Sequence, residues 1–199
     1  HVKDLFENFF IRMTRGAGLK GLISLEKKIK LSTVVLLRPL INFEKKDLEF
    51  ISKYVFNFFV NDPSNKNTNF QRIRIRNIID ELENNGLDKN KLLLTLRNLK
   101  KSNQALSFYV ERNKNLNSFF DEKNKKMILN QTFFNHPYEV VFRSLSDSLK
   151  IVGKKYYSAR GKKIDKILDK IKNNGLKKET LAGCIIKKVN QTIIITKEY

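Results

Sequence analysis

The chain has 199 residues, and 41% of them are hydrophobic, which is enough to bury one good-sized core or two small ones and excludes a disordered polyelectrolyte. Its 40 Lys and Arg residues outnumber its 20 Asp and Glu residues. The net charge of +20 indicates a polyanionic partner, with nucleic acid as the first candidate and an anionic membrane as the second. Codon bias is an alternative source of this charge, because the whole chain is rich in Lys, Asn and Ile.

The chain has no apolar run near the roughly 18 residues of a membrane span, and no charged-then-apolar leader at its start. The single cysteine, Cys184, allows no intrachain disulfide and fits a reducing cytoplasm. Because the first residue is His1 and not Met, we expect the chain to begin inside a longer protein.

The first 84 residues combine helical patterns with a strand and turns. A helix is predicted over residues 2–14, where apolar and aromatic side chains recur at helical spacing, and a glycine-rich stretch ends it. Residues 33–37 predict a short buried strand. A second helix is predicted over residues 44–59, with Asn42 as its N-cap and an inward face made by Leu48, Ile51, Val55 and Phe58. A turn at residues 62–65 precedes a third helix over residues 70–84, which Gly86 is expected to stop.

Long helical patterns dominate the chain after residue 84, and we place a domain boundary between residues 84 and 85. Helices are predicted over residues 89–113, 138–151 and 162–173, and the first of them has a basic face opposite its apolar stripe. Residues 119–136 favour a hairpin, and residues 180–196 favour two strands around Asn190 and Gln191. The predicted fold class is therefore α/β, followed by a mainly helical region with a short C-terminal β hairpin.

Acidic side chains form a polar stripe on the first predicted helix. His1, Asp4 and Glu7 are spaced i, i+3, i+6, so they share one face beside the aromatic face. Two carboxylates on one face suit an ammonium group or a metal ion. The alternative is a solvated acidic helix start, which the helix dipole favours, and on these residues alone the alternative is preferred.

The stretch from Gly16 to Gly21 matches the string G-x-G-x-x-G, which binds dinucleotides when a strand precedes it and a helix follows. Here an amphipathic helix precedes it, so we reject that interpretation. The glycines instead predict a tight backbone turn, with Arg12, Arg15 and Lys20 close enough to contact a phosphate.

Three arginines open the helix predicted over residues 70–84. Arg72 and Arg76 are four residues apart and share a face, whereas Arg74 points elsewhere. Guanidinium groups bind phosphate or carboxylate through two parallel hydrogen bonds, and the N–H groups of a helix start add to an anion site. A solvated basic face is the alternative, although this chain otherwise prefers Lys to Arg.

Other reactive groups form no recognisable centre. His136 precedes Pro137 and is expected in a loop, and Cys184 lies in an apolar stretch and is expected in a core. The sequence has no Cys/His cluster for zinc, no P-loop string and no Ser-His-Asp set that it can support. These motifs alone predict a basic α/β-plus-helical protein that binds RNA.

Several segments, taken in chain order, resemble the tRNA(Ile)-lysidine synthase family. The family has H-x-x-D-D-x-x-E-[TN], R-x-x-R-G-x-G-x-x-G-L, an R-P-L step, D-P-[ST]-N, R-x-R-[IL]-R and, in members with a short C-terminal region, T-L-G-G-C. The corresponding segments of this chain start at His1, Arg12, Arg38, Asp62, Arg72 and Thr180. The resemblance is carried mainly by residues 1–80 and again by residues 156–199.

The resemblance implies an ATP-dependent ligase that joins free L-lysine to C2 of the wobble cytidine of tRNA(Ile) through an adenylated tRNA. Residues 1–84 would be the back half of a Rossmann-like ATP-pyrophosphatase domain, and residues 85–199 a helical tRNA-recognition domain with a small α+β tail. The implied cofactor is ATP, with Mg²⁺ as a further candidate. The implied partners are tRNA(Ile) and lysine in the cytoplasm, with no membrane contact, and a homodimer is left open.

The family's site residues carry over to matched positions. Asp4, Glu7 and Arg72 are implied to hold lysine, the carboxylates through its ammonium groups and the guanidinium through its carboxylate. Further substrate contacts are expected from Arg12, Arg15, Asn65, Arg74 and Arg76. Phosphate contacts are expected from the basic face of the helix over residues 89–113, at Lys91, Arg97, Lys100 and Lys101.

The chain departs from the family pattern in two places. The family's ATP-binding S-G-G-x-D-S loop is absent from the 199 residues, so we expect a fragment that cannot adenylate tRNA alone. The family's D-D pair is here a single residue, Asp4, three residues after His1 instead of four. Because one residue turns a helix by about 100°, any role of His1 is left open.

Two rival interpretations are kept. A related tRNA thiolase of the ATP-pyrophosphatase fold is disfavoured, because such enzymes usually bring cysteine pairs. A non-enzymatic basic RNA-binding protein needs no carboxylates opposite an arginine. This interpretation is therefore favoured if Asp4, Glu7 and Arg72 do not converge in space.

Overall fold

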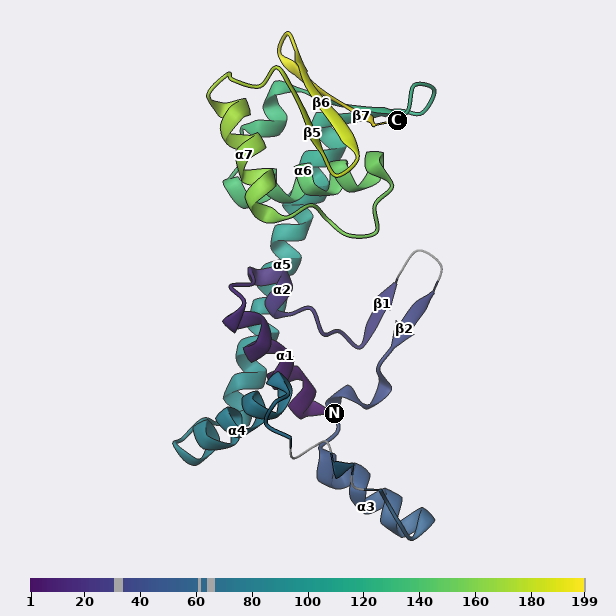
Figure 1. Ribbon diagram of the computed structural model, residues 1–199, viewed down its shortest axis with the longest axis vertical. Coiled ribbons are helices and arrows are strands. Elements are labelled where there is room, and N and C mark those ends of the chain that lie inside the picture. Colours follow the sequence, from purple (N-terminus) through teal and green to yellow (C-terminus); the bar gives the residue numbers. More distant parts are fainter. Residues whose placement is uncertain (31–33, 61, 64–66, 199) are drawn as a thin grey trace. The chain divides into compact units, whose positions relative to one another are not determined.

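A computed structural model describes residues 1–30, 34–60, 62–63 and 67–198 of the protein (Figure 1). The chain divides into two compact units, His1–Asn103 and Gln104–Tyr199, and each has its own hydrophobic core. In the part of the chain that is described, no helix is both long enough and apolar enough to cross a membrane.

The first unit is mostly helical. Its elements in chain order are α1 (Val2–Thr14), α2 (Leu19–Leu22), β1 (Lys28–Lys30), β2 (Val35–Leu37), the 3-10 helix η1 (Pro39–Asn42), α3 (Lys45–Phe56), α4 (Gln71–Asn84) and the first part of α5 (Lys89–Asn117). The helices predicted over residues 2–14 and 70–84 are confirmed as α1 and α4. Gly86, with a φ of +101°, follows the end of α4 as expected.

Helix α1 packs against α4 and the first turns of α5. The fully buried Phe6 of α1 joins Ile75 and Ile79 of α4 in one cluster, which Leu92 and Leu96 of α5 complete. These residues recur every three or four positions on their helices, so each helix contributes one apolar stripe. The core therefore holds α1 and α4 together, and the candidate site residues lie on these two helices.

Two apolar segments of this unit are exposed where burial was predicted. The strand predicted over residues 33–37 appears as β2, whose three residues are all exposed; residue 33 lies outside the described residues. The side chains predicted to point inward from this helix are also open: Ile51 and Val55 of α3 are exposed by 50% and 61%, and Phe58, which lies beyond the end of α3 at Phe56, by 65%. An apolar pattern marks a face that can be buried, but nothing in the described residues covers this one. The N-cap prediction is wrong as well, because α3 begins after Glu44 while Asn42 lies in η1.

The second unit is built on a five-stranded antiparallel sheet with the strand order β3-β4-β7-β6-β5. Its elements after α5 are β3 (Ser118–Asp121), β4 (Lys126–Leu129), the 3-10 helix η3 (Gln131–Phe134), α6 (Tyr138–Gly153), α7 (Gly161–Lys172), β5 (Lys178–Leu181), β6 (Cys184–Val189) and β7 (Thr192–Lys197). The predicted hairpin around Asn190 and Gln191 is confirmed as β6 and β7. It is part of a larger sheet, because β7 also pairs with β4 and β6 with β5.

Helix α6 packs on the central strands of this sheet (Figure 1). Buried side chains alternate along β4, β6 and β7, and Leu145 and Leu149 of α6 are fully buried with them. A polar contact also joins α5 to α6 in this unit: Asn113 Nδ2 donates to the Phe133 carbonyl oxygen at 3.1 Å and to Ser144 Oγ at 3.2 Å. The second unit thus combines an apolar core with satisfied buried polar groups.

The two compact units divide inside α5, between Asn103 and Gln104, whereas the sequence places a boundary between residues 84 and 85. The first turns of α5 stay with the first unit because Leu92 and Leu96 belong to its core. The division into functional domains over residues 1–84 and 85–199 stays a prediction.

Candidate functional site

The first unit has an ion pair between α1 and α4 whose carboxylate is buried. Glu7 is 1% exposed, and its carboxylate accepts hydrogen bonds from Arg76 Nε at 2.6 Å and from Nη2 at 3.4 Å. Two-point pairing of this kind is among the stronger carboxylate–guanidinium geometries. The hydrogen bond to Glu7 raises the pKa of Arg76, burial opposes the rise, and the charges of Asp4 and Asp80 add to it. Arg76 therefore stays positively charged.

Further contacts show that α1 and α4 run antiparallel where they meet. Lys3 Nζ donates to Asp80 Oδ1 at 2.9 Å, and this bond raises the pKa of Lys3. At the other end, Arg15 Nη2 donates to Gln71 Oε1 at 2.6 Å. Moving forward along α1 thus means moving back along α4, and this register pairs Glu7 with Arg76.

Asp4 and Arg72 are the more open of the three residues implied to hold lysine. The Asp4 side chain is 37% exposed and accepts a hydrogen bond from the backbone nitrogen of His1 at 2.8 Å. Arg72 is exposed, one helical turn before Arg76, and forms no hydrogen bond or ion pair with the described residues. No hydrogen bond or ion pair between described residues therefore joins Arg72 to Asp4 or Glu7. The helix pair therefore presents a partly open carboxylate and an open guanidinium beside a closed ion pair.

The other predicted substrate-binding residues have different surroundings. Arg74 Nη1 donates to the carbonyl oxygens of Thr68 and Asn69, both at 2.9 Å, and so braces the turn that leads into α4. Arg12 is exposed on the last turns of α1. Asn65 lies outside the described residues.

The glycine-rich stretch forms a tight turn directly after α1, as the sequence predicts, but its last glycine, Gly21, lies in the short helix α2, which the sequence did not predict. Gly16 has a φ of +67°, which favours glycine. The backbone N–H groups of residues 16, 17, 21 and 22 all donate to nearby backbone carbonyl oxygens. These four groups are therefore not free to cradle a triphosphate, and a phosphate contact from the basic side chains near the turn stays a prediction.

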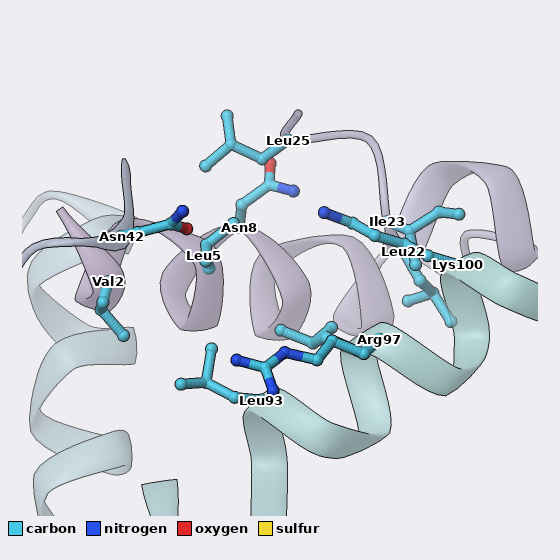
Figure 2. Close-up of a pocket in the computed structure, with 11 residues that line it drawn as sticks. Val2, Leu5, Asn8, Leu22, Ile23, Leu25, Asn42, Leu93, Arg97 and Lys100 are labelled. Carbon is cyan, nitrogen blue, oxygen red and sulfur yellow. The ribbon is translucent and has the colours of Figure 1, made fainter. Parts of the chain in front are cut away.

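A pocket of about 290 Å³ lies between α1, the segment after α2 and α5 within the first unit (Figure 2). Arg97 and Lys100 of α5 point toward it, and neither forms an ion pair with the described residues. Apolar side chains form most of the remaining wall: Val2, Leu5, Leu22, Ile23, Leu25, Leu93 and Leu96. Two cations that have no counter-ion in the described part of the chain suit a phosphate or a carboxylate. They are two of the four residues predicted to contact phosphate.

Sequence reasoning assigned no binding role to the two asparagines of this pocket, Asn8 and Asn42. Asn8 Nδ2 donates to Ser24 Oγ at 3.3 Å, and Asn8 lines the same pocket as Lys100 (Figure 2). A sequence pattern could have pointed to Asn8. Val2, Leu5 and Asn8 are spaced i, i+3, i+6, which puts one amide on an otherwise apolar face of the helix.

Cys184 and His136 lie where the sequence predicts them, in a core and in a loop. Cys184 is fully buried, and burial, helped by the charge of Glu198, raises the pKa of its thiol to about 11. His136 is exposed in the segment between η3 and α6. Among the described residues, no group of three His, Cys, Asp or Glu side chains could hold a metal ion.

Comparison with known proteins identifies the relatives of this chain. Residues 1–82 match the PP-loop domain family. The whole chain aligns with the tRNA(Ile)-lysidine synthases of Wolbachia sp. subsp. Brugia malayi (strain TRS), at 29% identity, and of Orientia tsutsugamushi (strain Boryong), at 31% identity. The chain is similar to tRNA(Ile)-lysidine synthases along its whole length.

The lysidine-synthase alignment covers both compact units of the chain. A third relative, the tRNA(Ile)-lysidine synthase of Wolbachia pipientis wMel, also aligns along the whole chain, at 28% identity. In each of these three relatives the chain covers 46% of the protein. The chain thus spans about half the length of the lysidine synthases that it matches.

Proposed function

We propose that this chain carries lysine- and tRNA-binding residues of an ATP-dependent ligase of the lysidine-synthase type. Such an enzyme joins lysine to C2 of the wobble cytidine of tRNA(Ile) through an adenylated tRNA, and we place it in the cytoplasm. The observation that carries the proposal is the alignment of relatives with this name along the entire chain. The net charge of +20 supports an RNA partner.

Asp4 and Arg72 are the residues proposed to contact lysine directly. A partly open carboxylate suits an ammonium group, and an open guanidinium suits a carboxylate through two parallel hydrogen bonds. Glu7 acts through Arg76 in this proposal, because its carboxylate is buried and already bonded twice. It is therefore a positioning residue that fixes Arg76 near Asp4.

Lysine binding by the chain tests these assignments. Arg72→Ala should weaken the affinity for free lysine about 10-fold or more, since a hydrogen-bonded charge contributes about 1.5–3 kcal/mol. Asp4→Asn should have a similar effect, and titration calorimetry or saturation-transfer NMR would measure both. The matched control is Arg112→Ala, an exposed arginine of the second unit, which should leave the lysine affinity unchanged. Equal affinities of the wild type and Arg72→Ala would contradict the proposal.

The role of Glu7 is tested in an active enzyme, through the kinetic constants for lysine. In a full-length protein that makes lysidine, Glu7→Ala should raise the KM for lysine more than it lowers kcat, because the displaced Arg76 disturbs binding. An unchanged KM for lysine would remove Glu7 from the lysine site.

ATP is proposed as the co-substrate on the basis of the PP-loop match, and Mg²⁺ remains a further proposal. PP-loop chemistry would supply an activated tRNA with AMP as leaving group. The 199 residues lack an S-G-G-x-D-S loop, and the four N–H groups of the glycine turn named above are engaged. We therefore expect the isolated chain to release no AMP from ATP and tRNA. Release above a protein-free blank would contradict that expectation.

The contacts to tRNA are proposed along two basic groups of the first unit. One comprises the arginines where α1 ends and α4 begins, Arg12, Arg15, Arg74 and Arg76. The other is the pocket with Arg97 and Lys100, whose charges have no described counter-ion. A homodimer is kept as a proposal without a structural argument.

A non-enzymatic RNA-binding protein is the second candidate function, because the high positive charge favours it and because no hydrogen bond or ion pair among the described residues joins Arg72 to Asp4 or Glu7. The same experiments separate the two. The ligase proposal requires that the chain bind lysine through Asp4 and Arg72, whereas an RNA-binding protein would bind tRNA and show no lysine binding.

A further inference from the structure

The second unit has a larger pocket, of about 550 Å³, that the proposed ligase site does not use. It lies where η3 and the start of α6 meet the end of α7 and the turn between β6 and β7. Its volume falls within the range of roughly 300–1,000 Å³ that is common for small-molecule sites.

The polar wall of this pocket consists mainly of amide side chains. Five of them, with one imidazole, line it: Gln131, Asn135, His136, Asn174, Asn190 and Gln191. Each amide offers both a donor and an acceptor, which is the pattern that reads the edge of a nucleobase.

The charge of the pocket is positive. No Asp or Glu lines it, but Lys172 and Lys188 do, and neither forms an ion pair with the described residues. Lys188 Nζ donates to Asn174 Oδ1 at 2.7 Å, which holds this ammonium group at the wall without neutralising it. The ligand should therefore combine a polar neutral edge with an anionic group.

Aromatic rings complete the lining. Phe134 packs beside the buried Phe133, with ring centroids 5.0 Å apart, and Tyr138 is 58% exposed. The hydroxyl of Tyr138 donates to Asp165 Oδ1, and its ring centroid lies 5.9 Å from that of Phe142, so the exposed ring is held from two sides. A fixed, exposed ring beside amides and lysines is typical of sites where an unpaired base stacks.

We propose that this pocket binds one nucleotide with an unpaired base. The base stacks on Tyr138 or Phe134, the amides bond its edge, and Lys172 and Lys188 bind its phosphate. Two sources share this chemistry: a free mononucleotide, and an unstacked nucleotide of an RNA strand. A free mononucleotide goes beyond the proposed ligase function, whereas an RNA nucleotide rests on the tRNA binding proposed there. Neither source depends on Asp4, Arg72 or lysine, so the site can fail independently of the lysine site.

Binding of two probe types to the intact chain tests the proposal. One probe is a set of nucleoside 5′-monophosphates. The other is a short single-stranded oligoribonucleotide, compared with the same strand carrying abasic positions. Tyr138→Leu should weaken binding about 5- to 150-fold, the range expected for one stacked base. Tyr157→Leu is the matched control, because Tyr157 is also exposed (79%) and does not line the pocket.

A second pair of variants tests the amide wall. The double variant Asn135→Ala/Gln131→Ala should weaken binding of the base-containing probe, whereas Gln104→Ala, an exposed amide of α5, should not. Circular dichroism and thermal melting would show that each variant is folded.

The outcomes separate the sources and decide the proposal. Tyr138-dependent binding of a mononucleotide supports a free ligand, and Tyr138-dependent binding of the strand alone supports RNA. Equal binding of the abasic strand, or equal affinities for Tyr138→Leu and Tyr157→Leu, would overturn the pocket as a base site. Lysine binding is measured separately, so its loss or presence does not affect this result.

Discussion

At the scale of single residues, the Glu7–Arg76 pair makes a direct prediction about stability. Glu7→Gln keeps the shape of the side chain but removes the buried charge opposite Arg76. We expect the free energy of unfolding to fall by about 1–3 kcal/mol, less than for a fully buried pair, because Arg76 is 31% exposed and water can partly solvate it. Urea unfolding followed by circular dichroism would measure the change.

The matched control for this prediction is Glu111→Gln. Glu111 pairs with Lys114 on the surface and its side chain is 61% exposed, so its loss should cost under about 0.5 kcal/mol. Similar urea midpoints of unfolding for Glu7→Gln and the wild type would show that the Glu7–Arg76 pair adds no net stability.

The same residues show how far sequence reasoning reaches. The spacing of Asp4 and Glu7 predicted a shared helix face, and the arginines at the start of α4 were expected to face anions. Pairing Glu7 with Arg76 was beyond the sequence, because Arg72 and Arg76 share a helix face and only the register of α1 against α4 decides between them. That register depends on how Phe6 packs with Ile75 and Ile79.

At the scale of secondary structure, the contact between α6 and the β5–β6 turn makes a second prediction. A Cβ atom at Gly153 would lie 2.4 Å from the backbone oxygen of Ala182 and 3.0 Å from Cys184 Sγ. Because the nearest atom belongs to the backbone, Gly153→Ala should lower the free energy of unfolding by about 1–3 kcal/mol, even though alanine favours helix. Thermal melting would measure the loss.

Gly161→Ala is the control for this change. A Cβ atom there would meet only the Phe142 ring, at an ordinary 3.6 Å, so this variant should be neutral or slightly stabilising. A Gly153→Ala variant as stable as Gly161→Ala would mean that the β5–β6 turn can shift away from the new methyl group without lowering the free energy of unfolding.

Elements with strong periodic patterns were predicted well, and elements defined by their neighbours were not. Helices α1, α4 and α6 have clear apolar stripes and were placed within a few residues. Strand β5 was missed, because only one of its four residues is buried and its pairing with β6 defines it. The apolar face of α3 was expected to be buried, but a pattern alone does not specify what covers it.

At the scale of the whole molecule, the net charge of +20 predicts that binding to tRNA is dominated by phosphate contacts. The logarithm of the binding constant should fall linearly with the logarithm of the salt concentration, at about 0.7–0.9 units per neutralised phosphate, so six contacts would give a slope of about −4 to −5. Filter binding or fluorescence anisotropy across a salt series would measure it.

Lysine binding supplies the internal comparison for the salt series. Free lysine is a small ion held by two short-range contacts in the proposed site, so its affinity should change far less with salt than that of tRNA. Lys100→Ala should reduce the tRNA slope by about one unit if Lys100 neutralises one phosphate, and should leave lysine binding unchanged. A tRNA affinity that hardly changes with salt would mean that the excess charge follows the composition of the chain and not an RNA-binding surface. The charge argument for both the ligase and the RNA-binding protein would then fail, and only the alignment with lysidine synthases would still support the ligase.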